Sequence, residues 1–253
     1  MKNTTIFGAL DPELVEHVSR RAAVGQSGKL AGALAIASMP VAFGLLARRA
    51  FAQGTALPAE IITVLNFALT LEYLEDEFYR TGLDTGGLIP PLSRPIFETI
   101  SVHEAAHVAL LTGAITSGGG TPVAKPTFDF TAGGVFDPFG VYEQFAALSQ
   151  AFEDTGVHAY KGQAGALMSN DAILTTALRI HSVEARHASA VRRLRGEKGW
   201  ITGNQTTLPG AAAAVYVGEE AGAGVTTAAS AEAFDEPLTV DQVLAIAELF
   251  IAA

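Results

Sequence analysis

The sequence predicts an all-α protein: an antiparallel four-helix bundle with one long crossover between its halves and an additional C-terminal helix. Apolar residues recur at helical steps of three and four in four long segments, and no alternating strand pattern persists. The connections between these segments are short, long and short in turn, which is typical of a bundle with a crossover. With 49% hydrophobic and 17% charged residues among 253, the chain can bury a sizeable core.

The long helices are expected over residues 58–80, 95–116, 138–167 and 171–195. Pro58 suits the first turn of the first helix, and Gly82 is expected to end it. Asp171 is expected to cap the fourth helix, which Gly196 ends. The crossover between the second and third helices reads TSGGGTPVAKPTFDFTAGGVFDPFG and is rich in Gly, Pro and Phe, as is usual for an irregular connection.

The chain divides into three regions: an N-terminal signal over 1–52, the bundle over 53–196, and a Gly- and Ala-rich extension over 197–253. Residues 197–237 lack a helical period and are expected to form a surface loop. The closing segment LTVDQVLAIAELFIAA is amphipathic, with Thr239 as its expected cap, and should pack on the bundle.

The N-terminal segment resembles a twin-arginine export signal. Ser19-Arg20-Arg21 precedes an apolar run, Leu30–Leu46, which is followed by the small-residue pattern Ala50-Phe51-Ala52. We expect cleavage after Ala52 and an exported protein, periplasmic or extracellular. In the alternative the segment is kept as a membrane anchor, although 17 apolar residues interrupted by Pro40 are short for a membrane-spanning helix.

Charge and cysteine content exclude several kinds of function. The net charge of −10 argues against a nucleic-acid partner, because phosphate neutralisation needs a basic surface. The absence of cysteine excludes disulfides, thiolate metal sites and cysteine nucleophiles. Any metal bound by this chain must therefore be held by carboxylates and imidazoles.

A carboxylate and an imidazole interrupt the apolar stripe of the fourth helix. In HSVEARHASAVRRL, Glu184 and His187 occupy positions where the helical steps would place core residues. The second helix carries the same pair as Glu104 and His107. Residues three apart lie on one face of a helix, so each pair can reach one metal ion.

The spacing of these residues repeats along the chain. The first and third helices present Glu72 and Glu153 at core-facing positions. Glu72 precedes Glu104 by 32 residues, and Glu153 precedes Glu184 by 31. A tyrosine follows each of these first glutamates after seven residues: Tyr79 in the first half and Tyr160 in the second. The chain therefore reads as the duplication of a two-helix unit.

Four buried carboxylates are very costly unless cations neutralise them. We expect two metal ions with one histidine each, held by Glu72, Glu104, His107, Glu153, Glu184 and His187. The ligand set is rich in oxygen with one nitrogen per metal, which favours iron or manganese over structural zinc, and iron is the first expectation.

These motifs resemble the ferritin-like superfamily, in particular the bacterial ferritin-like domain family related to plant desiccation-related proteins. The resembling phrases lie within about residues 57–250: LNFALTLEYLEDEFY, HEAAHVALLTGAI, AFEDTGVHAYKGQA, IHSVEARHASAVRRL and AFDEPLTVDQVLAIAELF. The resemblance implies a di-metal carboxylate centre in which Glu104 and Glu184 bridge the ions, while Glu72 and Glu153 are terminal ligands.

Other polar residues have weaker claims as ligands. Glu75 lies on the stripe of the first helix, but its counterpart in the third helix is Gly156, so it is expected at most to be a supplementary ligand or to pair with Arg80. Three histidines without symmetric counterparts are expected on the flanks: His103, His158 and His181.

The two tyrosines of the stripe and the basic end of the fourth helix are expected to have structural roles. Tyr79 and Tyr160 are expected to be core aromatics, with hydrogen bonds to ligand carboxylates as the open alternative. The stretch RRLRGEK is expected to be the solvated end of the fourth helix.

Two functions of different classes fit this description. In the first, an exported di-iron protein uses dioxygen or peroxide at the metal pair, as a ferroxidase-like or a peroxide-consuming protein. In the second, the chain is a stress-associated structural protein in which metal serves stability, and FDFTAGGVFDPFG and the Gly/Ala segment are interaction surfaces. The long loops and the extra helix favour a small homo-oligomer over a ferritin-type shell.

Overall fold

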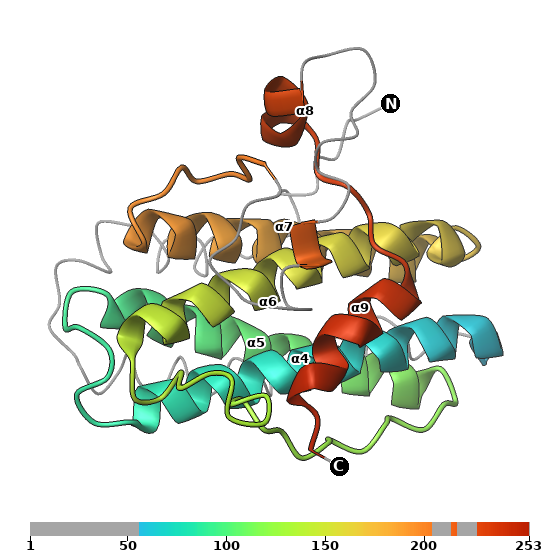
Figure 1. Cartoon of the computed structure of the whole chain (residues 1–253). Coiled ribbons are helices and arrows are strands. Elements are labelled where there is room, and N and C mark those ends of the chain that lie inside the picture. Colours follow the sequence, from blue (N-terminus) through green and yellow to red (C-terminus); the bar gives the residue numbers. More distant parts are fainter. Residues whose placement is uncertain (1–55, 204–213, 217–226, 253) are drawn as a thin grey trace, which may run out of the picture. The chain divides into compact units, whose positions relative to one another are not determined.

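Four long helices form the main body of the protein (Figure 1). The computed structural model describes residues 56–203, 214–216 and 227–252, all of which belong to one unit of the chain, Met39–Ala253. The long helices are α4 (Ala59–Asp84), α5 (Arg94–Ser117), α6 (Tyr142–Gln163) and α7 (Asp171–Leu194). No strand forms in the described ranges, and the only β contact there is an isolated bridge between Phe128 and Ile251.

The helices pack as two antiparallel pairs. α4 packs along α5 and α6 along α7, while α4 also contacts α6, and α5 contacts α7. Each pair has a short connection: residues 85–93 in the first, and the 3-10 helix η2 (Ala164–Leu167) with residues 168–170 in the second. Residues 118–141 form the long crossover between the pairs. This confirms the predicted four-helix bundle.

The first helix does not end at Gly82 but continues to Asp84. The reason is close packing between helices rather than helix termination. A Cβ atom at residue 82 would lie 2.2 Å from Cε2 of the fully buried Phe145 on α6, so only glycine lets the ring pack against this turn. The glycine is therefore a contact point between α4 and α6.

Two other helix starts differ from the expected ones. α6 begins at Tyr142 rather than near 138, because the chain first turns at Asp137, whose Oδ1 accepts a hydrogen bond from the Gly140 amide at 3.0 Å. α7 is capped by Asn170, whose Oδ1 accepts a hydrogen bond from the Ile173 amide at 3.1 Å, and not by Asp171.

The C-terminal region packs on the bundle through a short helix. α9 (Val240–Ala247) contacts α6 and leads into a 3-10 turn, η4 (Glu248–Phe250). Its expected cap, Thr239, forms a capping box with Gln242. Within the segment expected to be loop, however, Thr227–Ala233 forms a helix, α8.

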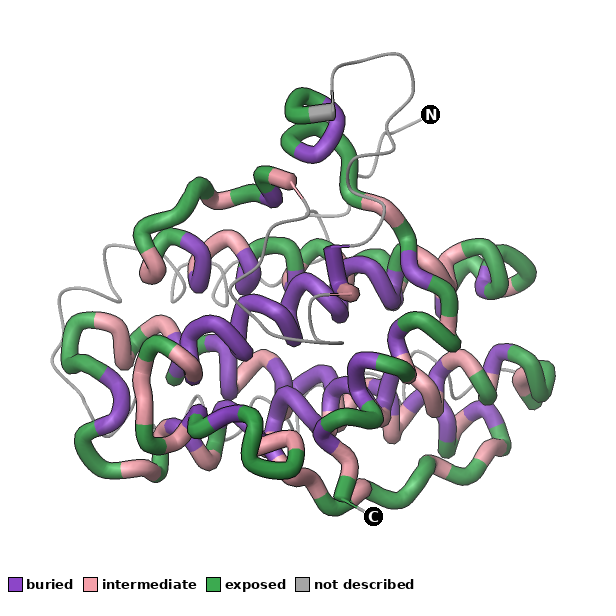
Figure 2. Tube along the Cα trace, viewed as in Figure 1, coloured by how far each residue is buried: buried purple, intermediate pink, exposed green. Residues whose placement is uncertain are grey.

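The core of the bundle is divided in two by a polar layer. One apolar cluster surrounds Phe78, Phe97 and Phe145, and the other surrounds Ile61 and Ile180. On each long helix the residues between the two clusters include buried acidic side chains. In Figure 2 the buried stretches run along the faces where the four helices meet. The fold thus places charge at the middle of the bundle.

The predicted export signal over 1–52 lies outside the described residues, which begin at Ala56. Among the residues that the structure describes, no helix is both long and apolar enough to cross a membrane.

Substituting Gly82 by alanine tests the close packing of α4 against α6. Because the added methyl group would overlap the Phe145 ring, G82A should lower the free energy of unfolding by about 1–3 kcal/mol. G165A is the matched control, since residue 165 is exposed and a Cβ atom added there would have no other atom within 4 Å. That control should leave stability unchanged or raise it by up to about 1 kcal/mol. Urea denaturation followed by circular dichroism measures both, and equal stabilities would contradict the packing argument.

Candidate metal centre

The six predicted ligands converge at the polar layer between the two apolar clusters. Each long helix contributes at its middle: Glu72 from α4, Glu104 and His107 from α5, Glu153 from α6, and Glu184 and His187 from α7. All four glutamates are 0% exposed, and the two histidines are 7% and 5% exposed. The local reason is helical periodicity, since these positions continue the buried stripe of each helix.

The six side chains form two groups that share two members. One group is Glu72, Glu104, His107 and Glu184, and the other is Glu104, Glu153, Glu184 and His187. Within each group one ligand atom per residue lies within 4.8 Å of all the others, close enough for all of them to bind a single ion. Because Glu104 and Glu184 belong to both groups, they are the two carboxylates that can bridge a pair of ions.

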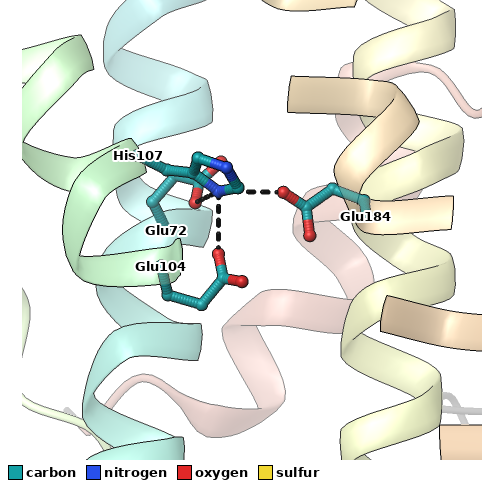
Figure 3. Close-up of side chains that lie close together, drawn as sticks. All are labelled: Glu72, Glu104, His107 and Glu184. Carbon is teal, nitrogen blue, oxygen red and sulfur yellow. Dashed lines mark hydrogen bonds and ion pairs between the residues drawn. The ribbon is translucent and has the colours of Figure 1, made fainter. Parts of the chain in front are cut away.

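Figure 3 shows the first group, with the His107 ring facing three carboxylates. His107 Nδ1 lies 3.2 Å from Glu72 Oε2, 3.0 Å from Glu104 Oε2 and 3.0 Å from Glu184 Oε1. One imidazole nitrogen carries at most one hydrogen, so it cannot satisfy three oxygens. A cation, in contrast, can bind a nitrogen and several oxygens at once.

The second group repeats this arrangement around His187. Its Nδ1 lies 2.9 Å from Glu104 Oε1, 3.1 Å from Glu153 Oε2 and 3.3 Å from Glu184 Oε2. Even so, Glu104 Oε1 and both oxygens of Glu184 are buried without a hydrogen-bond partner among the described residues. Buried unpartnered oxygens at the shared carboxylates are the atoms that bridging cations would bind.

Two tyrosines hold the unshared glutamates from the opposite half of the bundle. The Tyr79 hydroxyl on α4 donates to Glu153 Oε1 on α6, and the Tyr160 hydroxyl on α6 donates to Glu72 Oε1 on α4. In each glutamate the other oxygen, Oε2, faces a histidine. This confirms the alternative in which the tyrosines bond to the carboxylates, and it leaves one oxygen of each glutamate directed at the centre.

Burial and mutual charge control protonation at the centre. Burial raises the pKa of Glu72 to about 8 and that of Glu153 well above its usual range, against the opposing effect of the neighbouring histidines. For Glu184 burial also opposes ionisation, but His107 and His187 outweigh it and lower the pKa. The pKa values of both histidines are raised because the surrounding carboxylates outweigh burial. In the absence of metal ions, protons on the glutamates and histidines therefore reduce the negative charge of this cluster.

His103 contacts one of the two histidines and has no counterpart at the other. Its Nδ1 lies 2.8 Å from His187 Nε2, and the two rings stack with centroids 5.1 Å apart. When His103 Nδ1 accepts a hydrogen bond from His187 Nε2, the Nδ1 of His187 is free of hydrogen and faces the carboxylates as a ligand atom. The equivalent position in the other half is Val183.

The other flanking residues have different surroundings. His158 is fully buried and interacts through Nδ1 with the backbone carbonyl of Glu236, while His181 is half-buried. Glu75 is buried but does not pair with Arg80, which instead forms an ion pair with Asp76 at 2.9 Å. The pairing of Glu75 with Arg80 is therefore wrong.

The expectation that RRLRGEK is wholly solvated is also wrong. Arg192 is 4% exposed and forms a buried ion pair with Asp154 of α6, and Tyr216 donates to Asp154 Oδ2 at 2.6 Å. Burial raises the pKa of Asp154 although Arg192 and Tyr216 oppose the shift. Tyr216 lies in a region without periodicity. Nothing in the sequence therefore indicates that Arg192, at the end of the fourth helix, has a buried partner.

Together, the helices and the cluster define a class: a four-helix bundle with carboxylate and histidine side chains gathered at its centre. The family described as "Ferritin-like domain" matches residues 60–197, which is more than half of the chain and includes all six side chains of the centre. The chain therefore belongs to the ferritin-like domain family. No curated protein matches it.

The pH dependence of stability tests the protonation of the centre. The folded protein without metal holds protons that the unfolded chain releases, since the pKa of Glu72 is raised from 4.5 to about 8 and those of Glu153 and the histidines are also raised. This contribution is complete below pH 4.5 and is lost as the pH rises through about 8, at about 1.4 kcal/mol per pH unit for each such proton.

Metal ions compete with these protons, so binding should release them. The melting temperature without metal should therefore fall between pH 5 and 8, while the increase caused by added Mn²⁺ should grow over the same range. Differential scanning calorimetry at several pH values, with and without Mn²⁺, measures both trends. An increase that is independent of pH would contradict the assignment of protons to this cluster.

Proposed function

We propose that the chain is a dinuclear metal protein that binds two ions, preferably iron, through Glu72, Glu104, His107, Glu153, Glu184 and His187. The observation that carries the proposal is the pair of four-residue groups with Glu104 and Glu184 in common. Manganese fits the same oxygen-rich ligand set and is the alternative metal.

Each side chain has a distinct part in this proposal. Glu104 and Glu184, which belong to both groups, would be shared by the two ions, while Glu72 and Glu153, oriented by the tyrosine hydroxyls, would each hold one ion. His107 and His187 bind through Nδ1, the nitrogen that faces the carboxylates. Two ferrous ions held by these residues would supply electrons for the reduction of dioxygen or peroxide. We propose a ferroxidase-like or peroxide-consuming reaction on this basis.

The second function, a structural or stress-associated protein, depends on surfaces for a partner. The phenylalanines of the crossover pack inward: Phe130 and Phe136 are buried, and the Phe136 and Phe250 ring centroids lie 5.9 Å apart. This observation favours the metal reaction over the crossover as an interaction surface. The relation to plant desiccation-related proteins remains part of the proposal and is supported by the sequence phrases alone. A small homo-oligomer also remains part of it, on the basis of the long loops and the extra C-terminal helix.

Substituting a shared carboxylate tests the dinuclear centre. The purified protein should bind about two iron ions per chain, and E104A should bind far less at both positions because Glu104 belongs to both groups. E143A, at an exposed glutamate of α6, is the control and should bind as the wild type does. Metal content by mass spectrometry and circular dichroism of each variant give the result.

The same proteins distinguish redox chemistry from a structural metal. After loading with Fe²⁺ under anaerobic conditions, the wild type and E143A should consume dioxygen or peroxide, and E104A should not. Stoichiometric iron without consumption of either oxidant would favour the structural function. Absence of stoichiometric metal, with E104A as stable as the wild type, would contradict the dinuclear centre itself.

We also propose export through the N-terminal segment, on the sequence pattern alone. A protein with a twin-arginine signal folds before it crosses the membrane, so metal could be loaded in the cytoplasm. The exported protein should begin at Gln53, and R20K/R21K should keep it in the cytoplasm. Mass spectrometry of the intact protein from each cell fraction measures both. An uncleaved N-terminus in the membrane fraction would instead support the anchor.

A further inference from the structure

The duplication is broken by one residue that lies beside the centre. When Glu72 is aligned with Glu153 and Tyr79 with Tyr160, Glu75 falls opposite Gly156. One half of the bundle therefore carries an additional carboxylate at a position where the other half has no side chain. The six-residue set treats the two metal positions alike and does not account for this difference.

The missing side chain at residue 156 makes room for the additional carboxylate. A Cβ atom at Gly156 would lie 3.5 Å from Glu75 Oε1 and 3.3 Å from Cγ of Glu184. The Glu75 carboxylate therefore reaches from α4 to the backbone of α6 and lies beside one of the shared glutamates. A larger side chain at 156 would crowd both.

Glu75 is buried without a partner that would explain it. It is 3% exposed, and no hydrogen bond or ion pair involves it among the described residues. Burial raises its pKa, and the carboxylates of the centre raise it further, with Glu153 and then Glu184 the largest of these effects. A buried carboxyl group without a partner is costly, and a nearby cation would remove that cost.

A small cavity adjoins this carboxylate between α4, α6 and α9. Its polar lining comes from Glu75 and Thr155, and the rest is Gly156 and apolar side chains. Glu75 lies outside both four-residue groups in its present rotamer. The glutamate side chain is flexible, and the cavity beside it together with the missing side chain at Gly156 leaves room for it to change rotamer.

We propose that Glu75 is a further ligand to the metal position formed by Glu104, Glu153, Glu184 and His187. The inference rests on the proposed dinuclear centre and makes its two positions unequal. The position beside Glu75 has five protein ligands and binds the first ion, whereas the position of His107 has four and keeps more room for an oxidant. Gly156 is then the residue that admits the fifth ligand.

Titration of the metal-free protein with Co²⁺ tests this assignment. Wild-type protein should bind two ions in separate steps, by calorimetry and by the visible absorption of the bound metal. E75Q keeps the size and hydrogen-bonding capacity of the side chain but removes the carboxylate. It should weaken the tighter step about tenfold or more and leave the other within about twofold. The absorption of the first ion should intensify as its coordination number falls, which a structural role would not produce.

E77Q is the matched control on the same helix. Glu77 pairs with Lys125 away from the centre, so this variant should reproduce both wild-type steps and the wild-type spectrum. Circular dichroism checks that each variant is folded. If E75Q does not fold, E75D, which places the carboxylate on a shorter arm, is titrated instead and should weaken the same step.

Three results would overturn the inference. Two wild-type steps and an unchanged spectrum in a folded E75Q or E75D would remove Glu75 as a ligand while leaving the dinuclear centre intact. Equal weakening of both steps would indicate a general structural effect and not ligation of one position. Failure of the wild type to bind Co²⁺ at all would remove the dinuclear centre, and the role of Glu75 with it.

Discussion

The need to neutralise four fully buried carboxylates governs this bundle. Glu72, Glu104, Glu153 and Glu184 lie between two apolar clusters, where an unpaired charge is prohibitively costly. Each long helix contributes one of them, so all four helices must meet in one register for the charges to be shared. The same requirement explains the two histidines and two tyrosines, which supply positive charge and hydrogen bonds to these oxygens.

α6 connects this centre to the rest of the protein. Every residue from Phe145 to Tyr160 is buried, so this helix has no solvent-facing side along most of its length. Adjacent residues on it face different partners, with Glu153 at the centre and Asp154 in the ion pair with Arg192. Because Tyr216 also bonds to Asp154, the C-terminal extension is tied to the helix that positions the centre.

The features with a regular period were predictable from the sequence, and those that depend on contacts between distant segments were not. The bundle and the gathering of the six side chains followed from stripes at helical spacing and from the duplication; their binding of metal stays a prediction. The role of Gly82 could not be predicted from the sequence, because it depends on contact with the Phe145 ring of another helix. The burial of Arg192 was missed for the same reason, because its partners lie on α6 and in an aperiodic segment.

The crossed hydrogen bonds of Tyr79 and Tyr160 bear on how such a chain could arise. Each half supplies the hydroxyl that orients the other half's glutamate, so a single two-helix unit could complete its site only by pairing with an identical copy. In such a symmetric dimer the residues equivalent to 75 and 156 would have to be the same. Joining the two copies in one chain removes that restriction, and the glutamate at one position and the glycine at the other are a difference that only the fused chain can encode.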